Sequence, residues 1–124
     1  MNTVTRAAAG LLSTGAALAC LAATSPAWAL TATTVTIHAD GTDLSGHVAS
    51  SDPACVEGRK VLLIKQVGAR GGGNDQRIAS DLADSAGNWD TGNTGIEGKF
   101  YAKVRATDTC GRDTSRTVRA VRNP

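Results

Sequence analysis

His38 and His47 are the side chains of this sequence that could most readily begin a metal site. They flank a predicted turn at Asp40–Asp43, and the stretches on both sides of that turn alternate apolar and polar residues. If the stretches pair as a β-hairpin, positions whose numbers sum to about 85 face each other, and the two imidazoles form a cross-strand pair. Such a pair could bind zinc or copper, with Asp40 nearby. Because the sequence supplies no certain third ligand, we expect polar residues on a solvent face and no metal cofactor.

A second group of possible ligands surrounds Gly87 and consists of Asp81, Asp84, Asn88 and Asp90. Calcium prefers several oxygen atoms that converge from one loop. The spacing differs from that of a helix–loop–helix calcium site, and no glutamate closes the group. We therefore expect a tight turn stabilised by aspartate side chains rather than a calcium site.

The segment 68–75 has the glycine content of a phosphate-binding loop. It lacks the Gly-Lys-Ser/Thr ending of such loops, and no helical pattern follows it. We predict instead a mobile hairpin loop that presents Arg70 to a partner. Serine, histidine and aspartate also occur, but in no arrangement typical of nucleophilic catalysis, so we predict no catalytic residues.

Aromatic rings that could stack on sugars are scarce after residue 29, where only Trp89, Phe100 and Tyr101 occur. Alternation along residues 98–107 places Phe100 in the core and Tyr101 outward, and Trp89 is expected in the core as well. One exposed ring is too few to predict a glycan-binding site.

Residues 1–29 have the organisation of a secretory signal peptide. The stretch 7–23 is apolar and rich in alanine, and Ala27 and Ala29 form an A-x-A cleavage site before Leu30. The apolar stretch is interrupted by polar residues and is shorter than a membrane span prefers. We therefore expect one folded domain over residues 30–124, secreted and without membrane insertion after cleavage.

Cys20 leaves an alternative to this cleavage open. Bacterial lipid-anchored proteins are cut just before a cysteine that follows a leucine and two small residues. Here Ala17-Leu18-Ala19 precedes Cys20, so the leucine is one place out of register. A cysteine that serves as a small apolar residue of the signal helix is the simpler interpretation.

The 124 residues are 41% hydrophobic and 3% aromatic, with a formal net charge of +2. Cleavage after residue 29 removes one base, Arg6, and no acid, so the remaining chain is close to neutral. It lacks the overall basic excess of proteins that bind nucleic acid or anionic membranes. Leu, Ile, Val and Phe make up about a fifth of residues 30–124, which is near the level where chains fail to build a core. The length allows one small domain and excludes a multidomain enzyme or a polytopic membrane protein.

Two cysteines, Cys55 and Cys110, remain after the predicted cleavage. In an exported chain such a pair predicts one disulfide, and metal binding by two cysteines would need further ligands. The bond would close a loop of about 55 residues and contribute roughly 4 kcal/mol in the chain-entropy model. We expect the small core to depend on it.

Short runs rich in Val, Ile and Thr, separated by clusters of Gly, Asp, Asn and Ser, predict an all-β domain. We expect seven strands, namely Thr34–Asp40, Ser45–Ser50, Gly58–Val67, Arg77–Leu82, Asn88–Thr91, Gly98–Thr107 and Ser115–Val121. If successive strands alternate in direction, the loops that contain Cys55 and Cys110 emerge at the same end. The pattern predicts a seven-stranded antiparallel β-sandwich of the immunoglobulin or transthyretin type.

Several fragments resemble one family: Gly46-x-Val48-x-Ser50, Cys55-x-x-Gly58-Arg59-Lys60-Val61, Asp84-x-x-Gly87-x-Trp89, Phe100-Tyr101-Ala102-Lys103-Val104 and Cys110. Over residues 46–121 the chain resembles the carboxypeptidase-regulatory-like, or transthyretin-like, modules of exported bacterial proteins. The resemblance implies a β-sandwich outside the cytoplasm and offers no catalytic residues. It also implies that Asp84 caps a turn through its side chain, that Gly87 takes a positive φ and that Trp89 fills the core.

We expect a secreted, non-catalytic module with an interaction or structural role at or outside the cell surface. Its partner would be an unidentified protein or cell-envelope component. Loops should carry the contacts: the Arg70 loop at one end, and at the disulfide end Asp52, Glu57, Asp108, Arg112 and Asp113. The alternative is a small-ligand carrier or an inhibitor of a secreted enzyme, and a third hypothesis is a hydrolase that uses His38 or His47.

Overall fold

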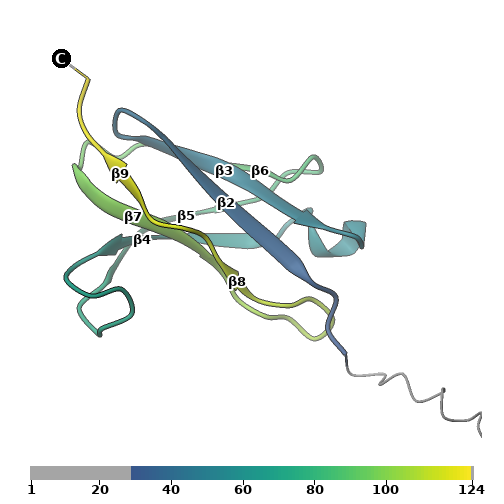
Figure 1. Ribbon diagram of the computed structural model, residues 1–124. Coiled ribbons are helices and arrows are strands. Elements are labelled where there is room, and N and C mark those ends of the chain that lie inside the picture. The colour runs from purple at the N-terminus through teal and green to yellow at the C-terminus, as the bar shows by residue number, and fades with distance from the viewer. Residues whose placement is uncertain (1–28, 124) are drawn as a thin grey trace, which may run out of the picture.

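Two antiparallel β-sheets make up the fold in the computed structural model (Figure 1). The structure describes residues 29–123, so the predicted signal segment up to Trp28, including Cys20, lies outside the described residues. One sheet has the order β2-β3-β6, with β2 (Thr33–Asp40), β3 (Asp43–Ser50) and β6 (Asn88–Asn93). The predicted all-β class is confirmed.

The second sheet has five strands. Its order is β5-β4-β7-β8, with β5 (Gln76–Leu82), β4 (Lys60–Gln66), β7 (Gly98–Val104) and β8 (Asp113–Thr114), and β9 (Val118–Ala120) also pairs with β7. A short 3₁₀ turn, η2 (Pro53–Cys55), connects the two sheets between β3 and β4. None of the residues that the structure describes belongs to a helix long and apolar enough to cross a membrane.

The predicted number of seven strands is wrong, because the last expected strand, Ser115–Val121, is divided. Its two parts pair with β7 in registers that differ by one residue: Thr114 faces Lys103, whereas Val118 faces Phe100. Between them, the hydroxyl oxygen of Ser115 accepts the hydrogen bond of the Ala102 amide at 2.8 Å. A side-chain oxygen thus replaces a backbone carbonyl of the ladder, and the strand continues one residue out of register, as at a β-bulge.

The core lies between the facing surfaces of the two sheets. Alternation along β2 directs Val35 and Ile37 inward, and β4 and β7 each add a run of three buried residues. The largest fully buried side chains are Trp89, Phe100, Leu44, Leu63, Val48, Val61 and Val104. Trp89 is 1% exposed, and its indole Nε1 donates to the carbonyl oxygen of Thr36 at 3.2 Å. The indole crosses β3 at Gly46, where a Cβ atom would lie 2.7 Å from Nε1 and 2.0 Å from the Thr36 oxygen, so only glycine fits there.

The disulfide between Cys55 and Cys110 closes one end of the domain. Both cysteines are buried, and their Cα atoms are 5.5 Å apart. Thr31 forms a parallel bridge beside Cys110, with its amide donating to the Thr109 oxygen at 2.9 Å. The start of the described chain, the β3–β4 connection and the β7–β8 connection are therefore joined at this end.

Candidate functional site

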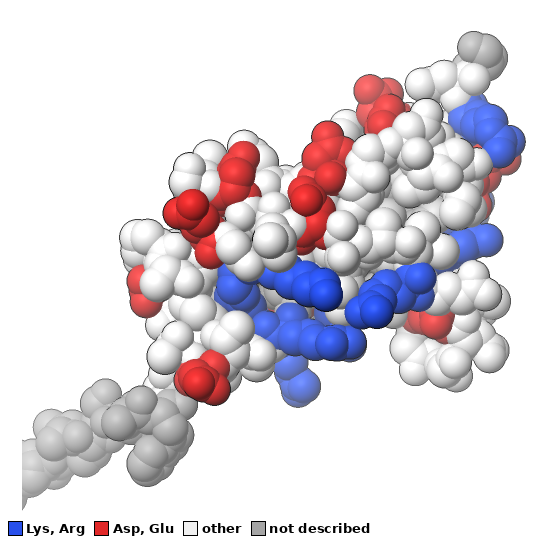
Figure 2. All heavy atoms as spheres, turned by 180° about the vertical axis from the view of Figure 1, so that it is seen from behind, with Lys and Arg blue, Asp and Glu red and all other residues white. Residues whose placement is uncertain are grey.

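Charge is segregated between the two sheets. Strands β2, β3 and β6 carry no lysine or arginine, and every Lys and Arg of the described residues lies between Arg59 and Arg122. In Figure 2 the Lys and Arg side chains gather in a band across one face, with a row of Asp and Glu side chains above it. The small net charge of the chain gives no sign of this separation, because it averages over both sheets.

The outer surface of the five-stranded sheet forms what we call the basic face. Its cations are Lys60, Arg77, Lys103 and Arg105, and its apolar floor consists of Leu62 and Ile64. The strand register builds this arrangement, because Leu62 is paired with Lys103, and Ile64 with both Tyr101 and Arg77. Leu62 is only 3% exposed although it points away from the core. Long cationic side chains commonly cover apolar residues with their aliphatic stems and keep their charges in water.

Two hollows adjoin each other along this face. One, of about 350 Å³, is lined by Leu62, Ile64, Asp75, Arg77, Tyr101, Lys103 and Arg105. The other, of about 250 Å³, is lined by Gly58, Arg59, Lys60, Leu62, Arg105, Ala106 and Thr107. Leu62 and Arg105 line both, so the hollows form one continuous surface on β4 and β7. The cations of this surface contribute no side-chain hydrogen bonds within residues 29–123, whereas Arg59 and Arg70 are bonded.

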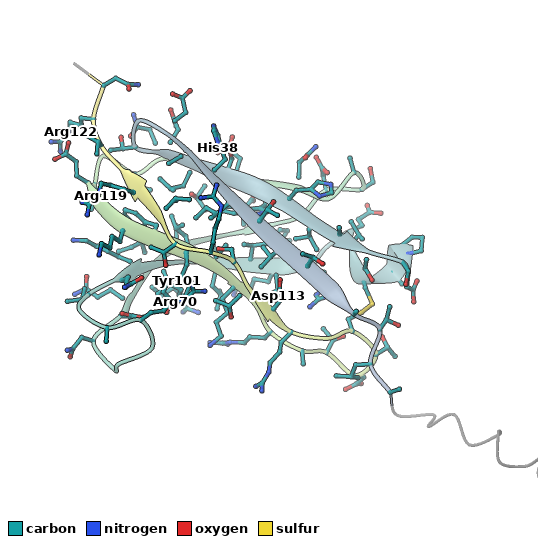
Figure 3. All side chains as sticks on the ribbon, viewed as in Figure 1. His38, Arg70, Tyr101, Asp113, Arg119 and Arg122 are labelled. Carbon is teal, nitrogen blue, oxygen red and sulfur yellow. A yellow bond between two sulfur atoms is a disulfide. The ribbon has the colours of Figure 1, made fainter. Side chains whose placement is uncertain are left out.

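The Gly-rich segment 68–75 connects β4 to β5 as a hairpin loop, as predicted, and polar side chains fasten it to this sheet. The Tyr101 hydroxyl donates to Asp75 Oδ2 at 2.5 Å, and the guanidinium of Arg70 lies 4.3 Å from the centre of the Tyr101 ring (Figure 3). Arg70 also donates to the hydroxyl of Thr117 at 3.1 Å and to the carbonyl oxygen of Ser115. Tyr101 is therefore 7% exposed, and the prediction of an exposed tyrosine is wrong because the loop covers the ring.

In a phosphate-binding loop the backbone amides bind the phosphate. Here the carboxylate of Asp75 takes that place. Its carboxylate accepts the backbone amides of Val67 at 3.0 Å and Gly71 at 2.9 Å. The hydrogen bond from Tyr101 is the main cause that lowers the pKa of Asp75, followed by the two amides. The pKa of Tyr101 is raised, first by burial and then by the hydrogen bond to the negative Asp75. The loop thus holds its own carboxylate and offers no phosphate cradle.

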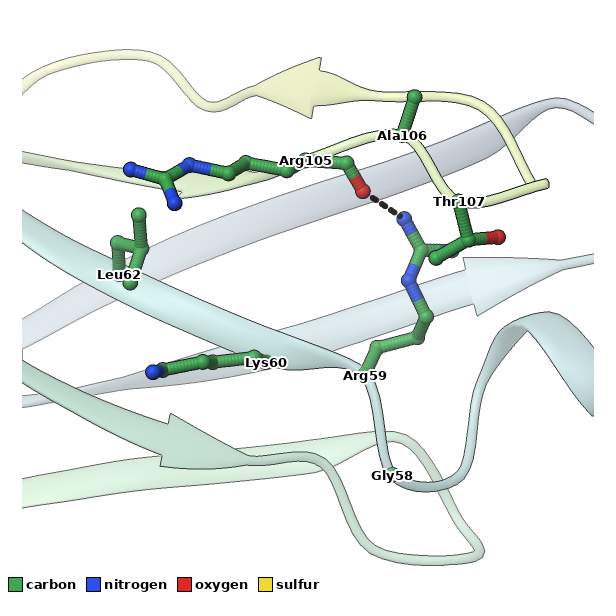
Figure 4. Close-up of a pocket in the computed structure, with 7 residues that line it drawn as sticks. All are labelled: Gly58, Arg59, Lys60, Leu62, Arg105, Ala106 and Thr107. Carbon is green, nitrogen blue, oxygen red and sulfur yellow. Dashed lines mark hydrogen bonds between the residues drawn. The ribbon is translucent and has the colours of Figure 1, made fainter.

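Arg59 is a buried cation at the end of the basic face (Figure 4). It is 6% exposed, and its two terminal nitrogens donate four hydrogen bonds. The acceptors are Thr33 Oγ1 at 3.0 Å, the Cys55 oxygen at 3.1 Å, the Arg105 oxygen at 2.9 Å and the Gly111 oxygen at 2.8 Å. All are neutral, and burial lowers the pKa of the guanidinium. The sequence places Arg59 in the fragment around Cys55 and Gly58 but gives no sign of its burial, because three of its four acceptors lie 26 to 52 residues away in the chain.

The predicted pairing of His38 with His47 is wrong. His38 faces Ser45, and His47 faces Thr36. The hairpin turns through only two residues, 41 and 42, so Asp40 faces Asp43 and the register differs by two from the one expected for a longer turn. His47 Nε2 donates to the carbonyl oxygen of Ala86 at 2.7 Å, which attaches β3 to the β5–β6 turn. Within residues 29–123, no three His, Cys, Asp or Glu side chains converge to hold a metal ion.

The aspartates around Gly87 stabilise the backbone of the β5–β6 turn and of β6 by accepting hydrogen bonds from their amides. Asp84 Oδ1 accepts the amides of Ala86 and Asn88, each at 2.9 Å, and Asp81 Oδ2 accepts the amide of Asp90 at 2.8 Å. Gly87 has a φ of +89°, and a Cβ atom there would lie 2.2 Å from the oxygen of Val48 on β3. The turn therefore packs directly against the neighbouring strand and leads into the buried Trp89.

The residues expected to contact a partner have different environments. Arg70 is bonded to the β8–β9 connection, whereas Asp108 and Arg112 are exposed in the connection that contains Cys110. Two others are engaged within the protein: Asp52 accepts the amide of Ala54 at 2.9 Å, and Asp113 that of Val35 at 2.8 Å. The basic face was not predicted from the sequence. The signal that could have found it is the outward position of Lys103 and Arg105 in the alternating segment 98–107.

In comparisons with known proteins, no family model matches this chain, and neither a curated protein nor a solved structure is significantly similar to it.

Proposed function

We propose that this protein is an exported, non-catalytic β-sandwich module that binds an acidic region of another extracytoplasmic protein through the basic face. The observation that carries the proposal is the concentration of unbonded cations over an apolar floor on one sheet. Charge complementarity at such a surface accelerates association and selects partners, and burial of the partly exposed Ile64 adds affinity. The disulfide supports a location outside the cytoplasm.

Features of the basic face favour a protein partner over a sugar or a nucleic acid. Sugars and unpaired bases bind by stacking on exposed rings. Tyr101, the aromatic residue of this face, is covered by Arg70. A partner with alternating acidic and apolar residues would match both the cations and the partly exposed Ile64. We also propose that the sandwich is of the immunoglobulin or transthyretin type, as the resemblance to carboxypeptidase-regulatory-like modules implies.

The alternative of a ligand carrier has less support. The hollows described above lie on the outer surface of the sheet, and Trp89 and Phe100 fill the space between the sheets. Inhibition of a secreted enzyme would be one form of the proposed function, in which the acidic region belongs to that enzyme.

Affinity isolation from envelope and extracellular fractions of the source cell, with paired charge-reversal variants, tests this proposal. Lys103→Glu with Arg105→Glu alters the basic face, and the control, Arg116→Glu with Arg122→Glu, makes the same change in net charge at exposed positions elsewhere. We expect the wild type and this control to retain a protein that moderate salt elutes, and the basic-face variant to lose it. Equal retention by all three, or retention of a polymer that contains no protein, would overturn the proposal.

A further inference from the structure

Arg59 retains one donor, Nε–H, that no residue in the described part of the chain accepts. Its four hydrogen bonds engage Nη1 and Nη2, and Nε makes none within residues 29–123. The side chain is 6% exposed, and it lines the hollow of about 250 Å³ on the basic face. Buried polar hydrogens are nearly always bonded to protein or to an ordered partner. The unbonded Nε–H group therefore indicates that an acceptor from outside the chain enters this hollow.

The hollow surrounds that donor with positive charge. Lys60, on β4, and Arg105, directly after β7, extend along its sides, and Arg59 lies at its inner end (Figure 4). The guanidinium is held in place by its four carbonyl and hydroxyl acceptors, so its orientation is fixed before a ligand arrives. The side chains of Lys60 and Arg105 are not bonded within the described residues and can close on a ligand.

We propose that this hollow is a subsite for one carboxylate side chain of the acidic partner segment, bound by Arg59 Nε–H and flanked by Lys60 and Arg105. The inference rests on the proposed function and names the group that the face recognises. Charge-assisted hydrogen bonds of this kind are shorter and stronger than neutral ones. A Glu or Asp side chain, with an apolar neighbour against the exposed Ala106, suits a volume of about 250 Å³.

A carboxylate fits this donor set better than a phosphate does. Phosphate sites in proteins commonly supply several fixed donors from a glycine-rich loop or a helix N-terminus. Here one fixed N–H group is combined with two flexible cations, and the floor is apolar. The nearby Gly-rich loop directs its amides to Asp75 and adds no donor to the subsite.

NMR spectroscopy of the ¹⁵N-labelled protein tests the assignment directly. The probe is a short, acetylated and amidated peptide that alternates glutamate and leucine, compared with its glutamine–leucine counterpart and with inorganic polyphosphate. We expect the acidic peptide to shift the Arg59 Nε–H resonance and the glutamine peptide to leave it unchanged. We expect Arg105→Gln and Lys60→Gln each to weaken peptide binding by roughly tenfold, the scale of one lost charge-assisted contact. Arg116→Gln, at an exposed arginine, serves as the control and should bind normally.

The possible results separate this inference from the proposed function. Peptide binding that depends on Lys103 and Arg77 without any shift at Arg59 would overturn the subsite and leave the basic face as the binding surface. An equal Arg59 shift with polyphosphate would show a general anion site and would also overturn the carboxylate assignment. Absence of peptide binding to the wild type would remove both proposals.

Discussion

The hydroxyl of Tyr101 donates a 2.5 Å hydrogen bond to Asp75, and this bond attaches the Gly-rich segment to the outer surface of the five-stranded sheet. Arg70 lies over the same ring and continues to Ser115 and Thr117 in the β8–β9 connection. A segment that is half glycine is thereby held to the sheet by two of its own polar side chains, Arg70 and Asp75. It borders the basic face and limits the space available to a partner.

Tyr101→Phe should destabilise the protein by a few degrees in melting temperature, and the effect should depend on pH. The pKa of Asp75 lies below its ordinary value, so its contribution is complete above about pH 4 and is lost as the pH falls through the folded-state pKa. The pKa of Tyr101 lies above its ordinary value, so its contribution is present below about pH 10 and is lost as the pH rises through the folded-state pKa.

The difference in melting temperature between wild type and Tyr101→Phe should therefore be largest from about pH 4 to 10 and should shrink on both sides. Thermal melts across this range measure it. In the variant, the pKa of Asp75 should rise toward its ordinary value, which carboxyl NMR detects. Asp108→Asn, an exposed control, should show neither change, and a difference that is constant with pH would argue against the hydrogen bond as its source.

Reduction of the Cys55–Cys110 disulfide should lower the melting temperature sharply. The bond spans 55 residues of chain, and removal of such a constraint costs roughly 4 kcal/mol in the chain-entropy model, close to the whole stability of a small domain. Melts with and without reductant, with free thiols counted, measure the effect. An unchanged melt of the fully reduced protein would mean that the core is sufficient alone.

Arg59→Met should be among the most damaging single substitutions at a charged position. Four buried or half-buried acceptors lose their donor, and we expect a loss of roughly 3 kcal/mol or more. Arg112→Met, at an exposed arginine, should change the free energy of unfolding by less than about 0.5 kcal/mol. Chemical denaturation measures both, and similar values for the two variants would contradict the role of Arg59.

Gly87→Ala and Gly58→Ala should differ although both glycines have positive φ. At Gly58 a Cβ atom meets nothing within 4 Å, so only the backbone strain of roughly 1–2 kcal/mol is expected. At Gly87 the added atom would also lie 2.2 Å from the Val48 oxygen, so the loss should exceed about 3 kcal/mol. Urea unfolding of the pair measures the difference, and equal losses would show that the turn can move away from β3.

Export predicts a defined N-terminus. Sequencing of the protein recovered from the culture medium should begin at Leu30, directly after the A-x-A motif. Recovery in the membrane fraction, with a lipid-modified N-terminal Cys20, would instead support the lipid anchor.

Much of the fold could be predicted from local sequence. Alternating residues such as Val35 and Ile37 on β2, or Phe100, Ala102 and Val104 on β7, identify strands because a strand directs successive side chains to opposite faces. The tight turn at Asp84 and Gly87 could also be predicted, because its hydrogen bonds join residues that are close in the chain. The pairing of Cys55 with Cys110 follows from the count of cysteines.

The candidate site depends on contacts that no local pattern contains. The turn length sets the His38 and His47 register, and Ser115 divides the last strand because its hydroxyl enters the ladder of β7. Asp75 reaches Tyr101, and Arg59 reaches Gly111, across 26 and 52 residues of chain. The sequence by itself determined the all-β class, the disulfide and the near-neutral charge. Only the tertiary structure decided that the cations share one sheet and that a loop covers Tyr101, because strand order and packing set which distant residues meet.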